Sequence, residues 1–263
     1  MSRIAAAFSK LKVDGRKGFI PFITAGDPDL ETTRALLVEL AHAGATVIEV
    51  GVPFSDPMAD GPTIQRASER ALRHGFGIKE ILQTIAAAQS EQPVPTVLFS
   101  YYNPLLRYGI ERLARDAQAA GVDGVLVTDL IPEEATEFTA ALRAHDLDTI
   151  FLVAPTSTDL RLQLIAERAS GFIYAVARAG VTGARAEMTR DAETLAERMR
   201  KYSNLPIAVG FGISTHDQVA DVWRYADAAI VGSAIVTEIE KSTNKRDAIT
   251  RVGTLVRNFL DPQ

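Results

Sequence analysis

Short apolar runs rich in β-branched residues alternate along the chain with longer segments in which apolar residues recur every three or four positions. The short runs are typical of buried strands, and the longer spacing is typical of helices that bury one face. The predicted strands cover residues 18–24, 47–51, 94–100, 124–128, 148–153, 172–176, 206–211 and 228–231. The predicted helices cover residues 30–43, 79–89, 113–120, 132–144, 159–169, 191–202, 215–225 and 246–259.

The alternation gives eight strand–helix units with no Pro/Gly-rich linker between them. This order predicts an α/β protein whose parallel strands close into a (β/α)8 TIM barrel, with an N-terminal helix and extra helical segments. The 263 residues fit one such barrel, which commonly has about 250. We therefore expect residues 1–263 to form a single domain. An open, doubly wound sheet is the alternative.

Composition excludes several classes of protein. Hydrophobic residues make up 47% of the chain, enough for a large core, and the net charge is -5 with no Lys/Arg-rich run, so no nucleic-acid partner is expected. The chain has no cysteine, which removes disulfides and thiolate metal sites. No apolar stretch approaches about 18 residues and the first residues do not look like a signal peptide, so we expect no membrane span and a cytoplasmic location.

Glu49 is an acidic residue inside an otherwise apolar strand, VIEVG over residues 47–51. Side chains alternate along a strand, so Glu49 faces the barrel interior if Ile48 and Val50 pack under the helices. Apolar surroundings would raise its pKa and suit it to proton transfer. The alternative is a structural carboxylate paired with a buried cation.

Asp60 ends the long loop that follows the Glu49 strand, so both carboxylates belong to one rim of the barrel. A second carboxylate there is a candidate catalytic group. The alternative is that Asp60, which precedes Gly61 and Pro62, caps the next helix.

Three glycine-containing loops follow the last three strands. They are Gly180–Ala184, Gly210–Ser214 and the segment from Val231 to Ala234, where a short helix is expected to start near Ser233. Glycines let backbone N–H groups approach an anion, and barrels commonly bind phosphate at the loops after strands seven and eight. The sequence predicts a phosphate site, although tight turns alone would also need glycine.

Two kinds of catalyst are missing from the expected rim. No lysine lies at the C-terminal end of a strand, and the four histidines are scattered in or beside helices, so neither a Schiff base nor a metal triad is visible. Any carbon–carbon cleavage would have to use the substrate as electron sink. Apolar residues near strand ends are candidates for the wall of a pocket or for barrel filling: Phe22, Tyr101, Leu126, Leu152, Tyr174 and Phe211.

Five segments are specific enough to suggest a family. They are Glu49–Gln65 (EVGVPFSDPMADGPTIQ), Tyr101–Pro104, Gly180–Ala184, Gly210–Ser214 and Val231–Val236. Through them the chain closely resembles the tryptophan synthase alpha chain family, nearly from end to end. Small departures are Thr128 and Ile131, where small residues or proline are frequent, and Ala177, where serine is often seen.

The resemblance implies a lyase of tryptophan biosynthesis that cleaves indole-3-glycerol phosphate to indole and glyceraldehyde 3-phosphate. It implies that Glu49 is the general acid and base and that Asp60 holds the indole N–H. It assigns no role to Arg178. The remaining implied substrate-binding residues are Phe22, Tyr101, Leu126, Thr128, Tyr174, Thr182, Gly183, Phe211, Gly212, Gly232 and Ser233.

The resemblance also implies a partner. Members of the family dock on a beta chain that holds pyridoxal phosphate, so an alpha2beta2 complex is expected, with no cofactor and no metal in this chain. The loop Pro53–Asp60 and the turn Tyr102–Leu106 offer apolar groups for docking. Alternatives are another phosphate-binding barrel enzyme such as a sugar-phosphate isomerase, a stand-alone indole-glycerol-phosphate lyase, and a barrel that only binds a ligand.

Overall fold

The strands form one closed parallel barrel in the order β1 to β8, with β8 hydrogen-bonded to β1. The structure is a computed structural model that describes residues 2–176, 185–210 and 212–261. The predicted TIM barrel is therefore confirmed. The strands are β1 (Gly18–Thr24), β2 (Ile48–Gly51), β3 (Thr96–Ser100), β4 (Gly124–Val127), β5 (Asp148–Val153), β6 (Ile173–Val176), β7 (Ile207–Gly210) and β8 (Ala228–Val231).

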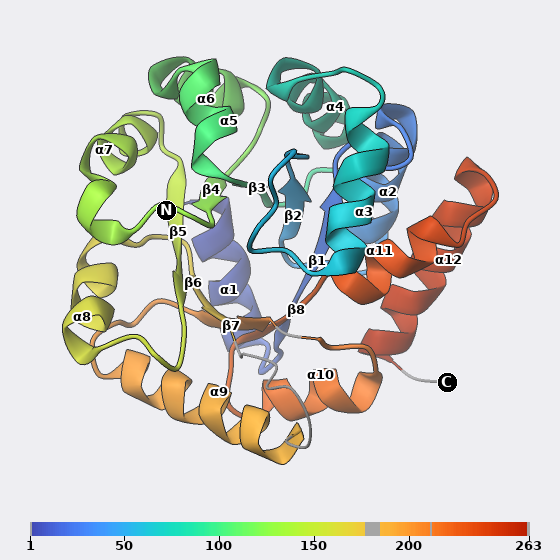
Figure 1. Cartoon of the computed structure of the whole chain (residues 1–263). Helices are drawn as coiled ribbons and strands as arrows, with labels where there is room; N and C mark the ends of the chain where they lie inside the picture. Colours follow the sequence, from blue (N-terminus) through green and yellow to red (C-terminus); the bar gives the residue numbers. More distant parts are fainter. Residues whose placement is uncertain (1, 177–184, 211, 262–263) are drawn as a thin grey trace.

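Helices surround the barrel, as Figure 1 shows in a view into its opening. They bury their apolar faces against the outward side chains of the strands in one continuous core. The helices are α1 (Arg3–Val13), α2 (Leu30–His42), α3 (Pro62–Leu72), α4 (Ile78–Glu91), α5 (Tyr102–Tyr108), α6 (Ile110–Ala119), the 3-10 turn η1 (Pro132–Glu134), α7 (Thr136–Ala144), α8 (Asp159–Arg168), α9 (Arg185–Arg200), α10 (His216–Trp223), α11 (Ser233–Glu240) and α12 (Lys245–Leu260).

Helix α1 lies across one end of the barrel, in the centre of Figure 1. Its buried residues Ile4 and Phe8 join the inward side chains of the strands in a second core cluster. Arg3 donates two hydrogen bonds of 2.7 Å to the carboxylate of Asp123, at the start of β4. This end of the barrel is therefore closed by packing and by an ion pair, which leaves the C-terminal ends of the strands as the open end.

Two predicted elements differ from the structure. The segment expected as a turn at Tyr102–Leu106 is the start of helix α5. Pro104 is compatible with it because the first N–H groups of a helix have no partner within the helix, and the N–H of Tyr102 donates to Asp129 at 2.7 Å. The helix expected over residues 132–144 is divided at Ala135 into η1 and α7.

Among the described residues, none of the helices has the length and apolar character needed to cross a membrane.

Candidate active site

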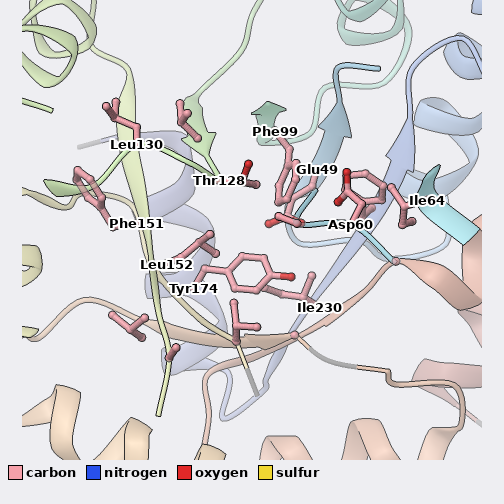
Figure 2. A pocket seen from close by; sticks show the side chains of 18 of the residues that line it. Glu49, Asp60, Ile64, Phe99, Thr128, Leu130, Phe151, Leu152, Tyr174 and Ile230 are labelled. Atoms are coloured by element: carbon pink, nitrogen blue, oxygen red, sulfur yellow. The ribbon is translucent and has the colours of Figure 1, made fainter. Parts of the chain in front are cut away.

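A cavity of about 680 Å³ opens at the C-terminal ends of the barrel strands. Figure 2 shows its side chains converging from several strands and loops, with Glu49 and Asp60 on one side and Tyr174 across from them. Most of the candidate residues that the structure describes line it: Phe22, Glu49, Asp60, Thr128, Tyr174, Gly212, Gly232 and Ser233. The barrel topology brings these residues together from strands and loops that are spread along most of the chain.

Glu49 faces the cavity from β2 and has a side chain that is only 1% exposed. Its neighbours Ile48 and Val50 pack in the outer core beneath the helices, as the alternation of the strand predicts. Both carboxylate oxygens are buried, and neither has a hydrogen-bond partner among the described residues. Among the described residues, no cation pairs with Glu49, which was the alternative interpretation.

Burial alone raises the pKa of Glu49 from its ordinary 4.5 to about 8. At neutral pH the carboxyl group is therefore mostly protonated and is able to donate a proton. After donation it becomes a base of moderate strength. An unpaired buried acid that faces a cavity lowers the stability of the fold, and such groups are typical of catalytic sites.

Asp60 does not cap helix α3, whose first turn begins after Gly61 without a side-chain hydrogen bond. Its Oδ2 instead accepts a hydrogen bond of 3.1 Å from the hydroxyl of Tyr101, and that hydroxyl accepts one of 2.9 Å from the N–H of Ala59. Burial raises the pKa of Asp60, and the hydrogen bond from Tyr101 opposes that rise. Tyr101 therefore orients Asp60 without itself lining the cavity.

Tyr174 on β6 lines the cavity, and its hydroxyl lies beside Gly210 at the end of β7. Burial, followed by the negative charges of Glu49 and Asp60, raises its pKa well above the ordinary value, so it remains a neutral phenol. Gly210 makes room for it, because a Cβ at position 210 would lie 2.4 Å from the Tyr174 hydroxyl. The glycine loop after β7 thus has a packing role in addition to any role in anion binding.

The glycine loops after β7 and β8 border the cavity at Gly212, Gly232 and Ser233. Gly212 has a φ of +49°, a left-handed conformation that other residues rarely adopt. Helix α11 starts at Ser233, and its N-cap Gly232 makes no side-chain hydrogen bond, so its first N–H groups are available. Such a helix start attracts an anion.

Several candidates are placed elsewhere. Leu126 is fully buried in the inner core cluster of the barrel, with Val97 and Ile150 of the neighbouring strands, and does not line the cavity. The expectation that Leu126 forms part of the pocket wall is therefore wrong for this structure. The candidates Thr182, Gly183 and Phe211, together with Ala177 and Arg178, lie outside the described residues.

The cavity also has apolar lining residues that no sequence pattern singled out. Phe99 on β3 contacts Phe22 edge to face, with ring centroids 5.2 Å apart. Strand alternation contained this signal, since Phe99 lies two residues after the inward Val97. Other such residues are Ile64, Leu130, Phe151 and Ile230. Together with Leu152, they make the cavity suitable for a flat apolar ring.

The described residues contain no group of three or more histidine or acidic side chains that is able to hold a metal ion. The site therefore combines two carboxylates of raised pKa, an apolar wall and a helix start. This combination suits acid–base chemistry on a substrate that has an apolar ring and an anionic group.

Comparison with known proteins identifies the family. A family model described as tryptophan synthase alpha chain matches residues 8–261. A tryptophan synthase alpha chain from Geobacter sulfurreducens is 52% identical over 243 residues, which cover 92% of each chain. The crystal structure of tryptophan synthase subunit alpha from Legionella pneumophila matches with a TM-score of 0.91 and 37% identity, covering 98% of this chain and 97% of that one. A crystal structure of tryptophan synthase from M. tuberculosis in an aminoacrylate-bound form matches with a TM-score of 0.89 and 38% identity, covering 98% of both chains. The chain belongs to the tryptophan synthase alpha chain family.

Proposed function

We propose that Glu49 is both the acid and the base of a carbon–carbon cleavage that releases indole. Membership in the family assigns the chain to the alpha reaction of tryptophan biosynthesis, in which indole-3-glycerol phosphate is cleaved to indole and glyceraldehyde 3-phosphate. The observation that carries the role of Glu49 is its buried carboxyl group, which faces the cavity with no partner for either oxygen among the described residues.

The proton transfers balance around this one group. Protonated Glu49 gives a proton to C3 of the indole ring, which becomes a positively charged indoleninium and accepts electrons. The ionised Glu49 then removes the proton from the side-chain hydroxyl next to C3. The O–H electrons form the aldehyde, the C–C bond breaks, and its electrons restore the aromatic ring. A pKa of about 8 suits both steps near neutral pH.

Asp60 is proposed to accept the indole N–H and to stabilise the positive charge that develops on the ring nitrogen. Its hydrogen bond with Tyr101 fixes the carboxylate in advance, so little reorganisation is needed when the charge appears. Burial raises the pKa of Asp60, and the same low-dielectric surroundings make the negative charge of the ionised group interact more strongly with a positive ring nitrogen than it would in water.

The phosphate is proposed to bind at Gly212, Gly232 and Ser233, with Thr182 and Gly183 as further contacts predicted from the sequence. The support is the uncapped start of α11 at the cavity. The indole ring is proposed to lie against the apolar wall, of which Phe22, Thr128 and Tyr174 are part. Phe211 stays a prediction for that wall.

A beta chain is the proposed protein partner, and the expected alpha2beta2 assembly belongs to this proposal. Two exposed apolar side chains beside the open end of the barrel support it: Met58, which is 86% exposed, and Leu106, which is 54% exposed. Pyridoxal phosphate is expected only in that beta chain. Mixing with a beta chain and sizing the product tests the interaction, and unchanged elution would contradict it. The cytoplasmic location and the single-domain organisation stay predictions.

The experiment for the reaction is release of indole from indole-3-glycerol phosphate by the purified chain, alone and with a beta chain. We expect indole and glyceraldehyde 3-phosphate in equal amounts. We expect Asp60→Asn to slow release while Asp56→Asn, a change in the same loop, has little effect. Turnover of a sugar phosphate without an indole ring, and none of the indole compound, would favour the isomerase alternative. Full activity without any beta chain would favour a stand-alone lyase.

A further inference from the structure

Two neighbouring helices that both start at the cavity are joined to each other by charged side chains. Helix α3 begins directly after Asp60 and Gly61, and helix α11 begins at Ser233. Neither helix start has a side-chain cap. Local hydrogen bonds of the usual kind therefore do not fix where these two starts lie.

Helix α3 holds Asp60 through a side chain. The amide of Gln65, in the first turn of α3, donates a hydrogen bond of 2.9 Å to the backbone carbonyl of Asp60. Ile64 of the same turn lines the cavity. A shift of α3 would therefore move the carboxylate that is proposed to hold the indole N–H.

The α3–α11 ion cluster, which consists of Asp27, Arg66, Arg70 and Glu240, connects the helices. Arg66 donates to both oxygens of Glu240, the last residue of α11, at 2.7 and 2.8 Å. Arg70 donates to Glu240 at 2.8 Å with one nitrogen. Its other two nitrogens donate to both oxygens of Asp27 at 2.8 Å.

Asp27 links the cluster to the barrel. It follows β1, and its side chain is only 1% exposed, whereas that of Arg70 is 25% exposed. Bidentate pairs between arginine and a carboxylate fix distance and orientation more strictly than single contacts. Between the cluster and the cavity, Ile64 and Ala67 of α3 pack with Val236 of α11 and with Phe22. The cluster and this packing together fix α3 against α11.

We propose that Arg66, Arg70 and Glu240 are positioning residues that set the spacing between the indole subsite at Asp60 and the phosphate subsite at Ser233. This inference rests on the proposed function, since it takes those two subsites as given. None of the three residues contacts the cavity. Their effect is on a ligand that must reach both subsites at once, because its two ends are held at a fixed separation.

The test compares linked and separate ligands. Glu240→Gln breaks the charged link while leaving the residues that form each subsite unchanged. Glu238→Gln is the matched control: Glu238 lies on the same helix, is 22% exposed against 29% for Glu240, and pairs with Lys241 and Arg251 instead of α3. The probes are indole, glycerol 3-phosphate and indole-3-propyl phosphate, which lacks the hydroxyl group that cleavage requires.

We expect Glu240→Gln to weaken binding of indole-3-propyl phosphate, and to raise KM for the substrate, by about tenfold. Binding of indole and of glycerol 3-phosphate should change less than about twofold, because each touches one subsite. Glu240→Asp, which keeps the charge on a shorter side chain, should lie between wild type and Glu240→Gln. A general loss of stability would not separate linked from unlinked ligands in this way.

Two results would overturn the inference. One is an equal effect of Glu240→Gln and Glu238→Gln on the linked ligand. The other is that Glu240→Gln weakens the binding of glycerol 3-phosphate as much as the binding of indole-3-propyl phosphate, which would indicate a local change at α11 only. If the wild-type chain releases no indole at all, the proposed function fails instead, so the two failures are distinguishable.

Discussion

Replacing Glu49 with glutamine is expected to stabilise the folded chain, and to do so increasingly as the pH rises. The folded-state pKa of Glu49 is about 8, against 4.5 for the ordinary group. Between these values the folded chain keeps a proton that the unfolded chain releases, so the stability of the wild type falls as the pH rises through that window. Glutamine is uncharged at every pH and lacks this dependence.

The difference in free energy of unfolding between the variant and the wild type grows by about 1.4 kcal/mol for each pH unit above the ordinary pKa, up to the folded-state pKa. Near pH 5 the variant and the wild type should differ by less than about 1 kcal/mol from this cause. At pH 7 the variant should be more stable by about 3 kcal/mol, and above pH 8 by about 5 kcal/mol. These are upper values, because water that enters the cavity lowers the cost of ionisation.

Urea unfolding of both proteins at pH 5, 6, 7 and 8 measures the effect. A difference of about 3 kcal/mol shifts the midpoint by about 1 M urea for a chain of this size. Glu137→Gln, which removes an exposed carboxylate from α7, shows how much of any trend comes from net charge alone. A Glu49→Gln difference that is the same at all four pH values would refute the assignment of a raised pKa.

Three further perturbations test other parts of the structure. Leu126→Ala should cost about 2–5 kcal/mol of stability in denaturation while KM stays within about twofold, because this side chain fills the barrel below the cavity. Gly210→Ala should lower kcat by about tenfold or more, because the new Cβ would lie only 2.4 Å from the present position of the Tyr174 hydroxyl and would force it to move. In a Tyr174→Phe background, which lacks that hydroxyl, part of the loss should be relieved. Ser233→Asp should weaken competition by glycerol 3-phosphate at least tenfold without lowering Tm, because a carboxylate at the start of α11 stabilises the helix but repels phosphate.

Residue periodicity was enough to predict the barrel and the direction of Glu49. Apolar strands buried on both faces, joined by amphipathic helices, have few alternatives to a parallel α/β fold. Alternation along β2 then determines that Glu49 and Ile48 face opposite sides. The same rule applied to β3 would have found Phe99, but a single phenylalanine in an apolar strand has no chemistry that distinguishes cavity wall from core.

Depth along the barrel axis and contacts between distant segments were not predictable in this way. Leu126 and Thr128 face the same side of β4, yet only Thr128 reaches the cavity, because the depth of each strand depends on its register with its neighbours. The hydrogen bond from Tyr101 to Asp60 and the ion pairs of Glu240 with α3 join residues far apart in the sequence. No local pattern indicates such pairs.

The rate of indole release by Glu49→Gln shows whether this one carboxyl group carries out the proton transfers. Glutamine matches the size of the neutral carboxyl group but transfers no proton at neutral pH. We expect the variant to release indole from indole-3-glycerol phosphate at least about a hundredfold more slowly than wild type at pH 7, while it binds indole-3-propyl phosphate within a few-fold of wild type. A variant that binds this ligand and still releases indole at close to the wild-type rate would contradict the proposed role of Glu49 as acid and base.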